Sequence, residues 1–173
     1  MRIGIIAEFN PLHSGHKYLI EQAQNLIAAN GSGGEIVCVM SEYFTQRGEV
    51  AITDGYTRAK EAVRSGCSLV IALPYLGSVA YSDDFARKSI EILDGAGITH
   101  LIFGTEEMDI EVFGEIYKKQ QEISPEKYRE LLKQGYSFAK INGELYGMSN
   151  NNPNFSLAYS YYKMIKKFAP HIK

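Results

Sequence analysis

The scarcity of tryptophan and cysteine, and a near balance of charges, limit the classes of function that this chain can have. Its 173 residues include no tryptophan and only two cysteines. Eighteen Lys and Arg residues stand against 20 Asp and Glu residues, which gives a formal net charge of -2. That balance excludes a chain-wide electrostatic attraction to nucleic acid or to anionic membranes.

The two cysteines and the short apolar runs narrow the possible classes of protein further. Cys38 and Cys67 do not form a C-x-x-C pair, so they predict reduced thiols rather than a disulfide framework or a zinc site. No apolar run approaches the ~18 residues of a membrane span, and the first residues lack the pattern of a signal peptide. We therefore expect a soluble, cytoplasmic protein without membrane association.

Apolar residues alternate between two periods along the first hundred residues. Short, nearly continuous apolar runs predict buried strands at residues 2–7, 35–40, 68–73 and 99–103. Helical periodicity predicts helices between them at residues 14–29, 54–65 and 83–93, and Asp54 is a good N-cap for the second. Strands that alternate with helices predict an α/β fold with a Rossmann-like, doubly wound parallel sheet.

The pattern changes after residue 106. Helical periodicity continues at residues 109–123, 125–134 and 155–168, without a further strand pattern. We expect residues 1–106 to form a Rossmann-like nucleotide-binding core. Residues 107–173 are expected to form a C-terminal helical extension packed on that core, as one compact unit.

The segment after the first predicted strand carries the clearest chemical signal. Ligands of open parallel sheets lie beyond the carboxyl ends of the strands, where helix N-termini favour phosphate. His13 and His16 lie three residues apart on one helix face, and Gly15 between them allows a ligand close to the backbone. We interpret both histidines as donors to phosphate oxygens in nucleotidyl transfer. The alternatives are a metal-binding pair or a solvated loop with incidental histidines.

Three further polar segments fall at the same edge of the predicted sheet. In the loop after the second strand, Gln46 is a candidate donor to a substrate oxygen. Arg47 is either a partner for phosphate or carboxylate or an ordinary surface arginine. Gly104 and Thr105 follow the fourth strand, where the backbone could lie against a base or ribose. Asn154, before the last helix, is either a cap or a further donor to a triphosphate.

Several segments resemble one known family in register along the chain. Residues 4–16 are similar to the opening of the tRNA(Met) cytidine acetate ligases, within the H-x-G-H nucleotidylyltransferase superfamily. This resemblance implies a fold of the HUP/nucleotidylyltransferase type. The similarity continues through residues 40–49, 69–74, 103–106, 135–138 and 153–157.

The resemblance implies an enzyme that uses ATP and acetate to form acetyl-adenylate and passes the acetyl group to the wobble cytidine of tRNA. His13, His16 and Arg47 are its expected catalytic residues, and Gln46 joins Arg47 in binding substrate. Gly104, Thr105 and Asn154 would contact the nucleotide, and Mg²⁺ would accompany the triphosphate. The implied ATP-binding segment consists of Ile6, Ala7, Glu8, Phe9, Asn10, Pro11, Leu12, His13, Ser14, Gly15, His16, Lys17, Tyr18 and Leu19.

The sequence departs from the family pattern near the expected site. Residues 54–56, Asp-Gly-Tyr, stand where the family has an Asp-Lys-Trp-like segment, and Ala72 replaces an acidic residue before Leu-Pro. Family members are longer, so we expect tRNA to bind weakly if this chain is complete. Two alternatives stay open: a short adenylyltransferase that acts on a small phosphorylated acceptor, and a non-catalytic ATP-binding module.

Overall fold

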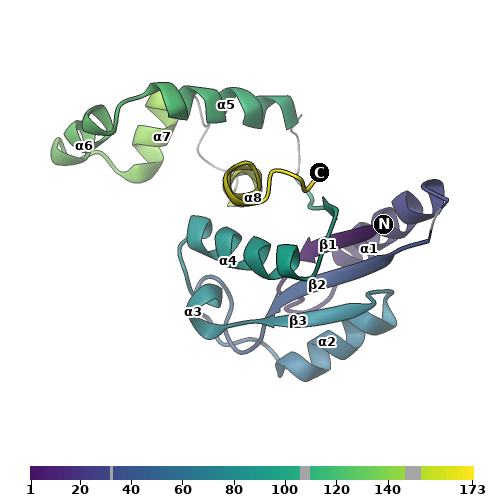
Figure 1. Cartoon of the computed structure of the whole chain (residues 1–173). Coiled ribbons are helices and arrows are strands. Elements are labelled where there is room, and N and C mark those ends of the chain that lie inside the picture. The colour runs from purple at the N-terminus through teal and green to yellow at the C-terminus, as the bar shows by residue number, and fades with distance from the viewer. Residues whose placement is uncertain (32, 106–109, 147–152) are drawn as a thin grey trace. The chain divides into compact units, whose positions relative to one another are not determined.

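A four-stranded parallel sheet, with strand order β3-β2-β1-β4, forms the first part of the fold (Figure 1). The computed structural model describes residues 1–31, 33–105, 110–146 and 153–173. The strands are β1 (Arg2–Ile6), β2 (Glu35–Ser41), β3 (Leu69–Leu73) and β4 (His100–Leu101). The four predicted strands are confirmed, although β4 is shorter than its apolar run.

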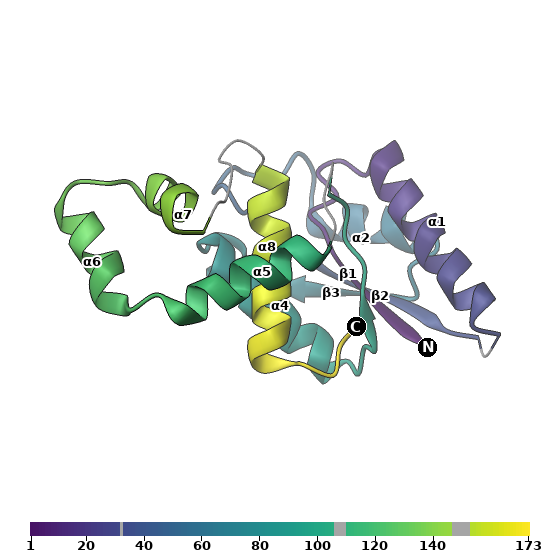
Figure 2. The same ribbon diagram turned by 90° about the horizontal axis from the view of Figure 1, so that it is seen from above.

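Helices cover both faces of this sheet. The chain steps outward from β1 to β2 and β3, and then crosses back past β1 to β4. Right-handed crossovers in opposite directions place α1 and α2 on one face and α4 on the other (Figure 1 and Figure 2). The predicted doubly wound α/β fold is therefore confirmed. These helices are α1 (Ser14–Ala29), α2 (Gly55–Arg64), α3 (Tyr75–Ser78) and α4 (Ser82–Gly95).

The core explains why β1 is apolar without alternation. One of its faces joins a buried cluster under α1 and α2. On the other face Gly4 leaves no room for a side chain, since a Cβ there would lie 2.6 Å from Cδ1 of Ile98 and 3.1 Å from Cδ1 of Leu93. Both faces of β1 are thus covered, as expected for a central parallel strand. The cluster contains Ile3, Ile5, Phe9, Ile20, Ala23, Ile36, Cys38, Met40, Ala62 and Cys67.

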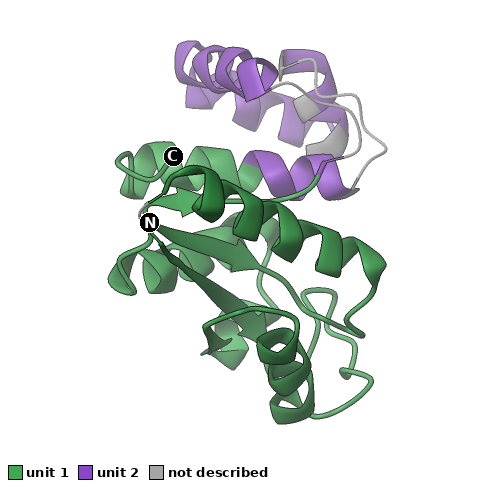
Figure 3. Ribbon diagram, turned by 90° about the vertical axis from the view of Figure 1, so that its right-hand side faces the viewer, with its two compact units in different colours: residues 1–104, 160–173 green, residues 105–159 purple. Residues whose placement is uncertain are grey.

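The chain divides into two compact units, coloured separately in Figure 3. The first contains residues 1–104 and 160–173, and the second contains residues 105–159. The last helix contributes residues to both units, whereas the sequence predicts all of residues 107–173 as one extension. The helices of this part are α5 (Ile110–Glu122), α6 (Pro125–Lys133), α7 (Phe138–Tyr146) and α8 (Pro153–Phe168). Both α7 and the short α3 are additions to the predicted elements.

The C-terminal residues belong to the sheet unit through backbone and side-chain bonds. The Lys173 N–H donates to the Thr99 carbonyl at 3.0 Å, and the Leu101 N–H donates to the Lys173 carbonyl at 2.9 Å. Asp83 of α4 accepts bonds from the Ser160 hydroxyl at 2.8 Å and from the Lys163 ammonium at 2.5 Å. These bonds explain why residues after 159 group with the sheet.

Within the described part of the chain, no helix combines the length and the apolar character that crossing a membrane requires.

Candidate functional site

The loop between β1 and α1 is held in one conformation by its own side chains. Phe9 has a φ of 47°, in the left-handed region that a bulky residue rarely adopts. Its ring is fully buried, and the edge of His16 lies against it with 5.0 Å between ring centroids. The Asn10 side chain accepts a hydrogen bond from the Ile52 N–H at 2.7 Å. Burial of Phe9 offsets a backbone strain of about 1–3 kcal/mol.

The two histidines form the N-terminal cap of α1. His13 is the N-cap residue, and its Nδ1 accepts a hydrogen bond from the Gly15 N–H at 3.1 Å. His16 reciprocates, because its Nδ1 accepts from the His13 N–H at 3.4 Å. The two rings stack with centroids 3.8 Å apart. A Cβ on Gly15 would lie 3.1 Å from Cε1 of His13, so glycine between the histidines allows this close cap.

The cap determines the tautomer of both rings. Since each Nδ1 accepts a hydrogen bond from a backbone N–H, each neutral ring carries its proton on Nε2. The His16 ring also forms a hydrogen bond with the backbone of Pro11. Burial, and then repulsion from His13, lower the pKa of His16 from 6.5 to about 4. His16 is therefore neutral near pH 7. His13 thus presents an Nε2–H donor at a helix N-terminus, beside the His16 ring that bonds the backbone of Pro11. A donor at this position is the chemistry expected for binding phosphate.

The rest of the segment Ile6–Leu19 surrounds this cap. Ile6, Ala7, Leu12 and Leu19 are half-buried, and the last three pack against the core cluster. Exposed side chains follow at Pro11, Ser14, Lys17 and Tyr18. The segment thus combines a buried support with an exposed surface at the start of α1.

The polar loop that the sequence predicts after β2 folds into a small hairpin. Tyr43 O accepts from the Ala51 N–H at 2.9 Å, and Thr45 N–H donates to Glu49 O at 2.8 Å. Gly48 has a φ of 82°, which allows the tight turn at the tip. Arg47 is exposed at this tip. Its side chain can therefore reach outward to an anionic ligand.

The other candidate in this hairpin holds the two loops together. The Gln46 N–H donates to the Glu8 carboxylate. The Gln46 carboxamide nitrogen donates to the Ala80 carbonyl at 3.1 Å. Gln46 thus joins the first loop to the segment before α4, and its carboxamide keeps a second N–H and an oxygen that could bond a substrate.

Arg58 is a functional candidate that the sequence does not reveal. It lies on α2 with a 2% exposed side chain, and its guanidinium donates to the carbonyls of Glu8, Glu42 and Thr53. A charge-assisted bond to each carbonyl is stronger than a neutral bond. Arg58 therefore fixes the ends of β1 and β2 relative to the start of α2. In the sequence it lies among polar helix residues, so nothing there distinguishes it from a surface arginine.

Beside β1, the end of β4 contributes the next candidate. The Ile102 N–H donates to the Gly4 carbonyl at 3.0 Å, so residues 103 and 104 leave the sheet next to the first loop. Gly104 is exposed, and no atom lies within 4 Å of a Cβ built there. Packing within the unit does not require glycine at this position. Open space at a strand end is what close approach of a ligand would need.

Tyr161 on α8 is a second residue that the sequence analysis did not identify as part of this region. It is buried and packs on Phe103 with 5.7 Å between ring centroids. Burial, and then the charge of Glu8, raise its pKa. Tyr161 therefore remains neutral and forms an apolar wall near the carboxylate of the first loop.

The remaining candidates belong to the second unit. Thr105 is the first residue of that unit, and Asn154 is exposed in the first turn of α8. Glu106 of the turn after β4 and residues 147–152 of the asparagine-rich run lie outside the described residues.

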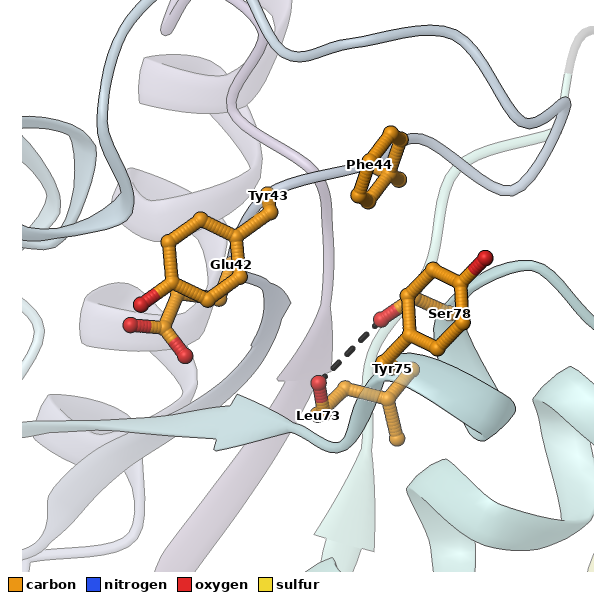
Figure 4. A pocket seen from close by; sticks show the side chains of 6 residues that line it. All are labelled: Glu42, Tyr43, Phe44, Leu73, Tyr75 and Ser78. Atoms are coloured by element: carbon orange, nitrogen blue, oxygen red, sulfur yellow. Dashed lines mark hydrogen bonds between the residues drawn. The ribbon is translucent and has the colours of Figure 1, made fainter.

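A small pocket lies beyond the ends of β2 and β3 (Figure 4). Its volume is about 60 Å³. The Ser78 hydroxyl at its side donates to the Leu73 carbonyl at 3.1 Å. This pocket was not predictable from the sequence, because α3, which supplies one wall, is not among the predicted elements. The lining residues are Glu42, Tyr43, Phe44, Leu73, Tyr75 and Ser78.

Relatives with known names match this chain along most of its length. The tRNA(Met) cytidine acetate ligase of Streptococcus pneumoniae (strain 70585) is 40% identical over 169 residues, which cover 94% of this chain and 44% of the relative. The protein of the same name from strain P1031 is 39% identical over the same shares. This chain therefore spans less than half the length of these relatives.

Solved structures show the same architecture. The crystal structure of Thermotoga maritima TmcAL bound with alpha-thio ATP superposes with a TM-score of 0.84 at 29% identity, over 99% of this chain and 45% of that chain. The apo form of that protein gives the same TM-score over 44% of its chain. The profile of the family described as HIGH Nucleotidyl Transferase matches residues 1–173. The chain therefore belongs to the HIGH nucleotidyl transferase family, as its histidine segment predicts.

Proposed function

We propose that this chain binds ATP at the start of α1 and forms acetyl-adenylate from ATP and acetate. The observation that carries the proposal is the histidine pair that caps α1, whose Nδ1 atoms accept backbone hydrogen bonds and whose rings lie at a helix N-terminus. The names of the relatives and the ATP analogue in the Thermotoga maritima protein support it. Residues 1–106 would be the nucleotide-binding core, and residues 107–173 the helical extension.

The chemistry assigned to the histidines is electrostatic. An acetate oxygen would attack the α-phosphorus of ATP, and the bond from that phosphorus to the pyrophosphate oxygen would break. Acetyl-adenylate and pyrophosphate would result, with no net proton transfer by the protein. His13 and His16 would donate to phosphate oxygens as negative charge shifts onto the leaving group. Arg47, at the exposed hairpin tip, would pair with phosphate or with the acetate carboxylate.

Mg²⁺ would accompany the triphosphate. In the described ranges, no group of three or more His, Cys, Asp or Glu side chains could form a metal site by itself. Mg²⁺ commonly binds through substrate phosphates and one or two carboxylates, and keeps several waters. Glu8 is the carboxylate within residues 6–19. These residues therefore fit an ion held mainly by the nucleotide, which neutralises phosphate charge during transfer.

In the second step an amine of a tRNA cytidine would attack the acetyl carbonyl carbon, and the bond from that carbon to the phosphate oxygen of AMP would break, releasing AMP and a proton. The names of the relatives suggest this acceptor. The net charge of -2 gives this chain little general attraction for RNA. Recognition of the acceptor would therefore depend on local contacts beside the nucleotide site.

Acetate-dependent exchange of labelled pyrophosphate into ATP tests the first step directly. The purified chain should catalyse exchange with ATP, magnesium and acetate, and not when acetate is omitted. Folded protein without exchange would contradict adenylate formation. Screening phosphorylated acceptors for adenylylated product then tests the alternative enzyme, and ATP binding without any product would indicate a binding module.

A further inference from the structure

The pocket beyond β2 and β3 lies where a second substrate would be expected. The strand order places β2 and β3 on one side of β1, and β4 on the other side. The proposed nucleotide segment follows β1, and Gly104 follows β4. Ligands of open sheets bind along this carboxyl edge. The pocket therefore lies on the β2–β3 side of this edge, beside the segment proposed for the nucleotide.

Size alone does not identify the occupant. A volume of about 60 Å³ has room for roughly four to six water molecules. A complete nucleotide needs a much larger cleft. Acetate would fit, and so would the edge of a pyrimidine ring inserted from solvent. The choice between them depends on the chemistry of the lining.

The lining favours an aromatic ring that carries a hydrogen-bond donor. Glu42 is its charged residue, and neither Lys nor Arg lines the pocket. A carboxylate there would repel acetate. Tyr43 and Tyr75 are 60% and 56% exposed, and Tyr75 meets Phe44 edge to face at 5.4 Å, so aromatic faces are available for stacking (Figure 4). Hydrogen bonding to Glu42 raises the pKa of Tyr43, which therefore stays neutral beside the carboxylate.

We propose that this pocket receives the cytosine base of the acceptor, whose exocyclic N4 amine donates a hydrogen bond to the Glu42 carboxylate. The inference rests on the proposed function and names the specificity site for its second substrate. Cytosine presents an N4 donor, whereas uracil presents an O4 acceptor at the same position. A carboxylate accepts from the first and repels the second. Glu42 thus distinguishes the two pyrimidines, while Tyr43 beside the carboxylate can stack on either one (Figure 4).

Arg58 connects this pocket to the proposed nucleotide segment. Its guanidinium donates both to the Glu42 carbonyl and to the Glu8 carbonyl. The Arg58 side chain therefore joins the backbone of Glu42 directly to the loop where acetyl-adenylate would form. This arrangement brings the N4 amine to the same edge of the sheet as the acetyl donor.

The absence of tryptophan from the sequence allows a local fluorescent probe. In Tyr75→Trp the indole is the chain's single tryptophan and lies at the pocket. We expect cytidine 5′-monophosphate to quench its emission saturably, and uridine 5′-monophosphate to bind about 10-fold more weakly, the effect of one hydrogen bond to a charged group. Adding Glu42→Gln should abolish this preference, whereas the matched change Glu49→Gln in the same hairpin should preserve it. Tyr43→Trp provides a second probe if Tyr75→Trp does not fold.

The outcomes separate this inference from the proposed function. Equal quenching by the two nucleotides, no quenching with either probe, or a cytidine preference that survives Glu42→Gln would overturn the base pocket. Displacement of cytidine 5′-monophosphate by a non-hydrolysable ATP analogue would assign the pocket to adenine and overturn it as well. Acetate-dependent pyrophosphate exchange, measured on the unmodified chain, depends on the histidine site. Loss of exchange with an intact cytidine preference would contradict the proposed function and leave the base pocket standing.

Discussion

The loops after β1 and β2 hold polar side chains at the edge of the sheet in opposite ways. In the first, His13 and His16 are fixed by each other and by backbone N–H groups, and buried Phe9 supports them. In the second, Arg47 projects from the tip of a hairpin and is exposed. Ordering the first pair costs little on binding because folding has already ordered it, whereas Arg47 must lose side-chain freedom when it meets a ligand. The first loop is suited to transition-state contacts and the second to adaptable substrate contacts.

The largest expected effect concerns the two fixed histidines of the first loop. His16→Ala should lower acetate-dependent pyrophosphate exchange on the order of 100- to 1,000-fold, because a preorganised donor to the reacting phosphates is lost. The thermal unfolding midpoint of the variant, measured at pH 7, should stay close to that of the unmodified chain.

A matched histidine controls for general effects of the substitution. His171 lies at the C-terminal end of the chain and pairs with Asp94 at 2.9 Å. His171→Ala should leave exchange unchanged. If both alanine variants retained full activity per folded molecule, the first loop would not act in the reaction.

The connection between the two loops predicts the next effect. Arg58→Met should lower the free energy of unfolding by roughly 3 kcal/mol or more, because three carbonyls lose their buried, charged donor. Arg64→Met, on the same helix but exposed and paired with Glu61, should cost less than about 0.5 kcal/mol. Urea unfolding followed by circular dichroism measures both. Equal losses would show that Arg58 does not hold the loops together.

The sequence and the structure agree where local signals act alone. The predicted bounds of α1 and the N-cap role of Asp54 are confirmed, because helical periodicity and a short acidic side chain determine them locally. The cap on α1 was not predictable in the same way. Histidine is an unusual N-cap, and its role depends on a reciprocal bond from His16 that only the folded loop shows.

The missed features depend on contacts between segments that are far apart in sequence. Arg58 is buried because its partners come from three other positions in the chain, and no pattern within α2 marks it. The hairpin that presents Arg47 is held by backbone bonds such as Ala51 N–H to Tyr43 O, without the alternating pattern of a strand. The roles of Arg47, Gly104 and Asn154 in ligand binding stay predictions.

Acid titration sharpens the account of the fixed histidine. The pKa of His16 is lowered from 6.5 to about 4, so between these values the unfolded chain binds a proton more readily than the folded chain. The contribution of the neutral ring to the free energy of unfolding is present above pH 6.5 and is lost as the pH falls toward 4. Its loss should reduce the free energy of unfolding by at most about 3 kcal/mol over that window. His16→Asn should lack this component when urea midpoints are compared at several pH values, and an unchanged pH dependence would contradict a half-buried, neutral ring.

The smallest expected effect belongs to the exposed hairpin tip. Arg47→Ala should change the free energy of unfolding by less than about 0.5 kcal/mol. It should raise the KM for ATP or acetate in the exchange assay by about 10-fold, because one charge-assisted bond to the ligand is lost. The effect should weaken with added salt. Unchanged kinetics would leave Arg47 as a surface arginine and restrict the site to the first loop.

The central claim is that the two histidine rings that cap α1 meet the triphosphate through Nε2, and nitrogen NMR of the imidazole rings tests it most directly. At pH 7 without ligand, both rings should carry their proton on Nε2 and not on Nδ1. Addition of ATP and magnesium should shift the Nε2 resonances of His13 and His16 while their Nδ1 nitrogens keep the signature of hydrogen-bond acceptors. Protonated Nδ1 atoms, or rings that do not respond to saturating ATP, would contradict the account.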